Sequence, residues 1–104
     1  MADHDARELT VTDNPAQSRY EIFVDGDLGG FAVYRDDSGR RVFTHTRIDP
    51  DYEGQGVGST LAERALDDVK AKGMGAVPRC PFIAAFIERH PEYADLLRAG
   101  SSGP

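Results

Sequence analysis

Three glycines at alternate positions lie within Glu53-Gly54-Gln55-Gly56-Val57-Gly58, between a strand-like run and a helix-like run. Glycine lets the backbone turn sharply and approach a ligand closely, because it has no Cβ atom. A helix start presents unpaired N–H groups and the positive end of the helix dipole, which together favour an anion such as phosphate. The spacing predicts a phosphate site at Gly54, Gln55, Gly56, Val57, Gly58 and Ser59. The alternative that spacing alone leaves open is a tight structural connection.

Two further side chains have types suited to group or proton transfer. Cys80, the only cysteine, lies between a predicted strand end and a predicted helix start. A helix N-terminus favours the thiolate, which can take an acyl group as a nucleophile. The alternative is a small buried hydrophobic side chain, the usual state of a free cysteine. His45 lies on a predicted strand, on the face of Phe43 and Arg47, where a neutral imidazole can accept a proton. Its alternative is a packed or hydrogen-bonded strand histidine.

Hydrophobic periodicity predicts the elements that must position these residues. β-branched and aromatic alternation, with turn signals such as Asp25-Gly26 between the runs, predicts an antiparallel meander of strands at residues 8–12, 19–24, 28–35 and 41–48. An apolar stripe of helical period, a short apolar run and a proline-initiated stretch follow. They predict a helix at 59–72, a strand at 75–78, a helix at 81–90 and a last short helix at 91–98. The fold class is α+β.

Size and composition restrict the function further. A chain of 104 residues with 39% hydrophobic and 29% charged residues predicts a single domain over 1–104, ordered at about 8–98 with frayed ends. A net charge of −6 without a basic cluster argues against a nucleic-acid partner. No run approaches the ~20 apolar residues of a membrane span. The single cysteine and the lack of a secretory signal favour the cytoplasm. No metal site is predicted, and the oligomeric state stays open.

The meander, the loop Gln55-Gly56-Val57-Gly58 opening a helix, and the strand and helix after it resemble the GNAT-type N-acetyltransferases. Their acetyl-CoA signature is Arg/Gln-x-x-Gly-x-Gly/Ala, which places Glu53 at the Arg/Gln position and Gly56 and Gly58 at the glycines. The chain is most similar to the small, truncated GNAT-like proteins. That similarity covers roughly residues 19–93 and includes Val77-Pro78-x-Cys80-Pro81-Phe82 and His90-Pro91-x-Tyr93.

The resemblance implies an acetyl-CoA-dependent N-acyltransferase that acts on a primary amine and lacks the substrate-capping helices of larger relatives. It implies that Ile48 offers backbone groups to the pantetheine arm, that Tyr93 lines the cofactor or covers the core, and that His45 or a water takes the amine proton. Many larger relatives carry a tyrosine that protonates the departing thiolate, near the position of Phe86 here; phenylalanine cannot donate a proton, so that role is absent or falls to another group such as Tyr93. Two alternatives follow from its loss: a non-catalytic CoA- or acyl-CoA-binding module, and a partner-binding accessory domain that kept only the fold.

Overall fold

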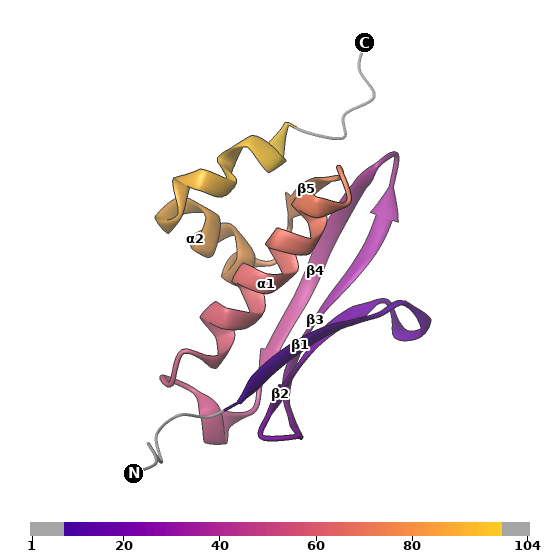
Figure 1. Cartoon of the computed structure of the whole chain (residues 1–104). Helices are drawn as coiled ribbons and strands as arrows, with labels where there is room; N and C mark the ends of the chain where they lie inside the picture. Colours follow the sequence, from indigo (N-terminus) through magenta and orange to yellow (C-terminus); the bar gives the residue numbers. More distant parts are fainter. Residues whose placement is uncertain (1–7, 99–104) are drawn as a thin grey trace.

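The computed structural model describes residues 8–98 and contains one five-stranded sheet in the order β1-β2-β3-β4-β5 (Figure 1). Strands β1 (Leu9–Asn14), β2 (Arg19–Val24), β3 (Asp27–Asp37) and β4 (Arg40–Ile48) pair antiparallel in succession, and β5 (Gly75–Pro78) runs parallel to β4. The helices are α1 (Val57–Ala71) and α2 (Pro81–Arg89), with 3₁₀ segments η1 (Pro15–Gln17), η2 (Pro50–Tyr52) and η3 (Pro91–Leu97). This arrangement confirms the predicted α+β class with its meander, loop, helix, strand and helix. The ends predicted to fray, 1–7 and 99–104, lie outside the described residues.

Two tight turns connect the central strands. Asp25 and Gly26 have φ values of 51° and 91°, and Ser38 and Gly39 have 55° and 82°. Positive φ at both central residues matches the right-handed twist of a hairpin, which explains why Asp-Gly and Ser-Gly occupy these positions. The second turn needs only two residues. Strand β3 therefore continues through residues 36–37, which the sequence assigned to the turn.

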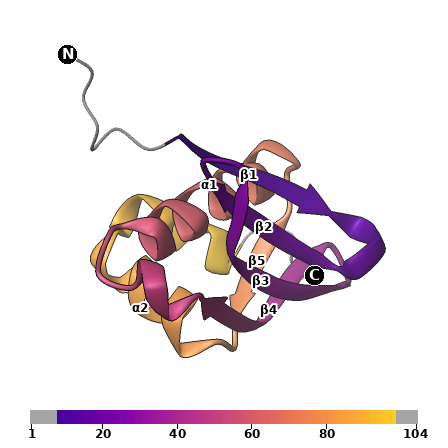
Figure 2. The same cartoon turned by 90° about the horizontal axis from the view of Figure 1, so that it is seen from below.

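Helix α1 connects the parallel strands β4 and β5, and α1 and α2 lie on the same face of the sheet (Figure 2). The apolar stripe of α1 is buried against side chains of β2, β3 and β4 that project from that face. Buried residues of the helices and of the sheet contact one another, so the two layers share one hydrophobic core. Its largest fully buried members are Tyr20, Phe43, Ile22, Leu61, Leu66, Ile83, Val57 and Val69.

A polar network fixes the C-terminal half of α1 to the sheet. The Tyr20 hydroxyl donates to Asp68 at 2.6 Å and accepts from Arg41 at 2.8 Å. Arg41 is buried and also donates two hydrogen bonds to Asp36, at 2.8 and 2.9 Å. Burial and the hydrogen bond to Asp68 raise the pKa of Tyr20 above its usual value. The hydrogen bonds from Arg41 hold the pKa of Asp36 below its usual range. This network lies on the sheet beside the last turns of α1, whereas the glycine loop precedes the first turn.

Candidate functional site

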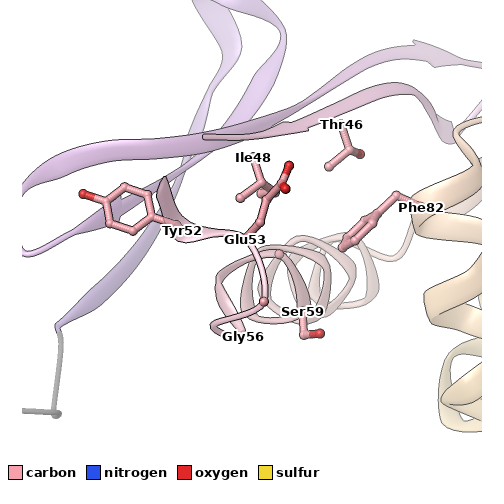
Figure 3. A pocket seen from close by; sticks show the side chains of 9 residues that line it. Thr46, Ile48, Tyr52, Glu53, Gly56, Ser59 and Phe82 are labelled. Atoms are coloured by element: carbon pink, nitrogen blue, oxygen red, sulfur yellow. The ribbon is translucent and has the colours of Figure 1, made fainter. Parts of the chain in front are cut away.

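A pocket of about 390 Å³ opens where the end of β4, the loop that follows it and the first turns of α1 and α2 meet (Figure 3). Strand, loop and both helix starts contribute to its wall. The lining residues are Thr46, Ile48, Tyr52, Glu53, Gly54, Gly56, Gly58, Ser59 and Phe82. The structure thus brings five of the predicted site residues into one cavity: Ile48, Gly54, Gly56, Gly58 and Ser59.

The loop reaches the pocket through two backbone turns that only glycine adopts easily. Gly54 and Gly56 have φ values of 78° and 80°, and a Cβ atom built on either would contact no other part of the protein. Their requirement for glycine is therefore conformational rather than steric. The loop begins at Asp49, whose side chain accepts the N–H of Asp51 at 2.9 Å and so caps η2.

The first turn of α1 faces the pocket without a side-chain cap. Gly56 is the N-cap residue, makes no side-chain hydrogen bond, and accepts the first helical hydrogen bond from Thr60 at 3.0 Å. No acidic residue lies in that first turn. The N–H groups of residues 57–59 consequently have no partner within the helix, and the positive end of the dipole is not neutralised. An anion is the ligand that such a helix start favours.

Gly58 is required for a different reason, namely close packing. A Cβ atom at this position would lie 2.7 Å from Cζ of Phe82 and 3.4 Å from Cγ1 of Ile48. Helix α1, helix α2 and the end of β4 therefore meet at this one residue. Any side chain at Gly58 would push the Phe82 ring and change the shape of the pocket.

Gln55 and Val57, which the sequence also assigned to the phosphate site, do not line the pocket. The Gln55 N–H donates to the carbonyl of Tyr52 at 3.3 Å, and its side chain donates to the carbonyl of Asp51 at 2.9 Å. The backbone donors available to a ligand at the helix start therefore begin after Gln55, later than the phosphate site predicted from the sequence. The Val57 side chain is buried in the core, so this residue can offer a ligand only its backbone N–H group at the helix start.

Among residues 8–98, Glu53 is the only charged side chain that lines the pocket. Figure 3 shows this side chain rising from the loop toward Ile48 on the strand above it. Asp49 and Asp51 lie just before it in the chain and are exposed to solvent. A diphosphate at the helix start would therefore meet a carboxylate rather than the arginine or glutamine of the signature.

A β-bulge in β4 decides which side chains enter the pocket. Val33 pairs with His45 but Tyr34 pairs with Phe43, so Thr44 is an additional residue on β4. The additional residue reverses the alternation of side chains beyond it. Phe43 is buried in the core, whereas His45 is exposed and Thr46 lines the pocket. The prediction that His45 shares a face with Phe43 is wrong for this reason.

One contact of the exposed His45 ring favours one tautomer of the neutral imidazole. Its Nδ1 atom lies 2.9 Å from the carbonyl oxygen of Thr44. A carbonyl oxygen only accepts hydrogen bonds, so this contact requires the hydrogen on Nδ1 and leaves Nε2 with its lone pair. The exposed Nε2 atom is therefore the basic nitrogen of this histidine.

Strand β4 loses its β5 partner at the bulge. The parallel pairing ends at Phe43 with Pro78, after which the N–H groups of Arg79 and Cys80 both donate to the Phe43 carbonyl at 3.0 Å. Within residues 8–98, no strand pairs with β4 on that edge beyond Phe43. An unpaired strand edge offers hydrogen bonds to an extended ligand that carries amide groups.

Cys80 is the N-cap residue of α2, and its side chain is only 3% exposed. It does not line the pocket itself. Its Sγ atom donates to Oγ1 of Thr46, which does line the pocket, at 3.1 Å. The thiol thus combines both expectations from the sequence, because it lies at a helix start and is also buried.

Tyr93 and Phe86 lie outside the pocket. Tyr93 is buried, and its hydroxyl donates to Asp67 of α1 at 2.6 Å. Burial and this hydrogen bond raise the pKa of Tyr93 above its usual value. Phe86 is buried and stacks on the His90 ring at 4.0 Å between centroids. The structure therefore places Tyr93 where it covers the core, the second of the two roles considered for it.

Sequence reasoning missed three of the lining residues, Thr46, Tyr52 and Phe82. Thr46 has a recognisable signal, because it lies two positions before Ile48 and strand side chains two apart share a face. Phe82 belongs to the Cys80-Pro81-Phe82 piece of the family resemblance, but the sequence assigned it no role in the site. Its half-buried ring reaches Gly58 across the pocket.

Within residues 8–98, no group of three or more His, Cys, Asp or Glu side chains is placed to hold a metal ion. Neither of the helices in that range is long and apolar enough to cross a membrane.

Comparisons with known proteins agree with this geometry. The sequence model of a family described as GCN5-related N-acetyl-transferase matches residues 19–96. The ribosomal-protein-S18-alanine N-acetyltransferase of Escherichia coli has a TM-score of 0.59 and 21% identity, covering 68% of this chain and 49% of that one. A GCN5-like candidate N-acetyltransferase of Staphylococcus aureus has a TM-score of 0.66 and 20% identity, covering 85% and 86%.

At these identities the structural likeness concerns the fold. This chain spans about half the length of the Escherichia coli enzyme. No curated protein matches the sequence.

Proposed function

The chain belongs to the GCN5-related N-acetyltransferase family, and we propose that it transfers an acetyl group from acetyl-CoA to a primary amine. The observation that carries the proposal is the uncapped start of α1, which faces a pocket between a glycine loop and an unpaired strand edge. The helix start suits a diphosphate, and the strand edge suits the amide-containing pantetheine arm.

The residues present fit acetyl-CoA in most respects. Gly54 and Gly56 keep side chains away from the helix start, and the backbone N–H groups of residues 57–59 are available to a diphosphate. Ile48 lies next to this loop at the end of β4, where its backbone can meet the pantetheine arm. When bound, acetyl-CoA supplies an activated acyl carbonyl. The one feature that opposes its binding is the Glu53 carboxylate in the pocket.

The order of these features along β4 gives the ligand a direction. The diphosphate end lies at the glycine loop, which follows Ile48. The acyl end therefore extends back along the strand toward Thr46 and the bulge at Thr44, where β5 diverges from β4. Holding a reacting carbonyl and an amine in fixed relative positions is itself a large part of catalysis.

His45 is the proposed base, either directly or through a water. It projects from the sheet on the face opposite to Thr46, on the same stretch of β4, which pairs with β3 on one edge and lacks a partner on the other. Its Nε2 atom carries the free lone pair and is open to solvent. An amine that approaches from the His45 face can lose its proton there while its nitrogen reaches the carbonyl at the strand edge.

A second candidate function is a CoA- or acyl-CoA-binding module without catalysis. Two observations favour it: α2 carries Phe86 at the position considered for a tyrosine, and the Tyr93 hydroxyl is already hydrogen-bonded to Asp67. The Phe86 ring has no proton to donate, and the Tyr93 hydroxyl already donates its proton to Asp67, so neither can protonate a departing thiolate from its present position. The two candidates differ in turnover and not in binding.

Backbone-amide NMR with matched ligands separates these possibilities. Titration with acetyl-CoA should shift the amides of residues 57–60 and of Ile48, and titration with pantetheine should shift Ile48 alone because it lacks the diphosphate. Release of the CoA thiol is then followed with a peptide that offers an N-terminal amine and a lysine. Absence of shifts at millimolar acetyl-CoA would sink both candidates. Shifts without thiol release above the protein-free rate would leave the binding module.

A further inference from the structure

The pocket contains a hydroxyl group that is oriented by the protein and, within residues 8–98, has no oxygen or nitrogen acceptor of its own. We propose that the Thr46 hydroxyl donates a hydrogen bond to the carbonyl oxygen of the bound thioester, and that Cys80 positions it for this role. The inference rests on the proposed function, since it assigns a catalytic donor to the same pocket. It makes Thr46 a catalytic residue and Cys80 a positioning residue rather than a nucleophile.

The first argument is a count of hydrogen bonds. A hydroxyl has one hydrogen to donate and two lone pairs, whereas a thiol has one weak donor. The Sγ atom of Cys80 lies 3.1 Å from Oγ1 of Thr46 and uses one of those lone pairs. Within residues 8–98, the only acceptor within reach of the Thr46 hydroxyl hydrogen is that same sulfur, which is a weak one. Because Thr46 lines the pocket, that hydrogen is available to a ligand.

The second argument is rigidity. Cys80 is held by its own backbone, because its N–H donates to the Phe43 carbonyl at 3.0 Å and its carbonyl accepts from Ala84 at 3.1 Å. The thiol is 3% exposed and cannot turn out to solvent without opening the start of α2. Thr46 is β-branched, so its χ1 rotamer is restricted. A donor fixed before the ligand arrives stabilises developing charge without reorganisation during the reaction.

The third argument is position. The pocket has two uncharged hydroxyl-bearing aliphatic side chains, Ser59 and Thr46. Ser59 lies at the start of α1 beside Gly56, on the diphosphate side, whereas Thr46 lies on the strand beside Phe82 (Figure 3). The acyl end of the ligand extends along β4 toward the second of these. Negative charge develops on the carbonyl oxygen as the amine attacks, and Thr46 is the side-chain donor on that side.

The same contact explains the buried cysteine. A nucleophilic thiol must reach the acyl carbon as a thiolate, but the Cys80 thiol keeps its hydrogen in a bond to Thr46 and does not line the pocket. Its effect on the reaction passes through Thr46. Replacing the thiol with another donor should therefore preserve the reaction better than removing it.

The test uses acetyl-CoA labelled with ¹³C at the carbonyl, bound to the full chain and to four variants. A hydrogen bond to the carbonyl moves its resonance downfield, and this readout requires no turnover. We expect a downfield shift in the parent protein and in Thr46→Ser, and a position near that of free acetyl-CoA in Thr46→Val. Cys80→Ala should give a reduced shift, and Cys80→Ser should restore it.

Binding and rate measurements on the same proteins complete the test. CoA itself lacks the thioester carbonyl. Its affinity for Thr46→Val should therefore be within about twofold of its affinity for the parent protein, since the substitution affects only the acyl end of the ligand. The rate of thiol release should fall by about 10²-fold in Thr46→Val, the usual effect of losing one donor at a developing oxyanion. Thr46→Ser should recover most of that rate, and Cys80→Ser should exceed Cys80→Ala.

Several outcomes would overturn the inference. If the ¹³C resonance of the thioester carbonyl does not move when acetyl-CoA binds the parent protein, the inference fails, and this result holds even if Thr46→Val does not fold. A full rate of thiol release in folded Thr46→Val also overturns it while leaving the proposed function intact. Acetyl transfer to Cys80 in near-stoichiometric yield, followed by its chase to an amine, would make the thiol a nucleophile. Failure of the parent protein to bind millimolar acetyl-CoA would remove both the inference and the proposed function.

Discussion

Replacing Glu53 with glutamine should tighten acetyl-CoA binding, because it removes a negative charge from a pocket proposed to hold a diphosphate. Glu53 is the only charged residue of the described range 8–98 that lines the pocket, and it lies directly before Gly54 and Gly56 of the glycine loop. In water, two unit charges about 6 Å apart interact by about 0.7 kcal/mol. A diphosphate with two charges would thus be repelled by about 1.4 kcal/mol, which corresponds to about tenfold in affinity.

Calorimetric titration of acetyl-CoA into matched variants measures this effect. Asp51→Asn is the control, since it makes the same change in net charge two positions away at an exposed residue that does not line the pocket. We expect Glu53→Gln to bind about tenfold tighter and Asp51→Asn to bind within about twofold of the parent.

The difference should shrink at about 1 M salt, where the screening length falls to about 3 Å. Equal affinities of Glu53→Gln and the parent at low salt would refute the reasoning. They would mean that the carboxylate turns away from the pocket when the ligand binds.

Three further predictions follow from the site and its support. Gly56→Val and Gly73→Val force a branched side chain into similar positive φ values, 80° and 70°, at opposite ends of α1. Both should lose about 1–3 kcal/mol of stability by urea denaturation, whereas only Gly56→Val should lose acetyl-CoA binding. His45→Ala should slow amine acetylation by about 10²-fold with an unchanged acetyl-CoA affinity, and an unchanged rate would exclude it as the base. Arg41→Leu should cost about 3 kcal/mol and lower Tm by about 15 °C, because it leaves Asp36 and Tyr20 without their buried donor.

The Arg41 network also gives stability a defined dependence on pH. The folded-state pKa of Asp36 lies below its unfolded value because Arg41 hydrogen-bonds its carboxylate. The associated stability is therefore complete above the unfolded pKa of about 3.9 and is lost as the pH falls through the lower, folded pKa. Arg41→Leu should show a shallower loss of stability over this acid range than the parent, which urea titrations at pH 3 and pH 6 would measure.

The fold was predictable from the sequence because local signals agree with the global arrangement. Asp25-Gly26 specifies a hairpin turn by itself, and Pro81 marks the observed first residue of α2. The apolar stripe of α1 has the period of a helix that covers a sheet. Where boundaries differ, tertiary pairing extends a strand: β1 continues through Asn14 because Asp13 and Asn14 pair with Tyr20 and Arg19 of β2.

The site was only partly predictable, because its lining depends on an irregularity without a residue-type signal. Neither glycine nor proline marks the bulge at Thr44, yet it moves His45 to the exposed face and Thr46 into the pocket. The glycine loop was found because positive φ and close packing both demand glycine. The orientation of the Glu53 side chain toward the pocket was not predicted, because a charged loop residue is equally compatible with solvent and with a pocket.

Cys80 shows why residue type and spacing cannot decide a chemical role by themselves. A lone thiol before a proline-initiated helix is consistent with a nucleophile and with a packed hydrophobic side chain, and the structure supports part of each. What separates them is the neighbour 34 positions earlier in the chain, because the thiol bonds to Thr46 across the sheet-helix boundary. That contact exists only because the bulge gives Thr46 the inward orientation. The chemistry proposed for this pocket therefore depends on how the bulge accommodates Thr44. Deleting Thr44 should leave Phe43 and Thr46 on the inner face and His45 on the outer face, because Tyr34–Phe43 and Val33–His45 would become consecutive pairs of a regular ladder, so the core packing and the pocket should persist.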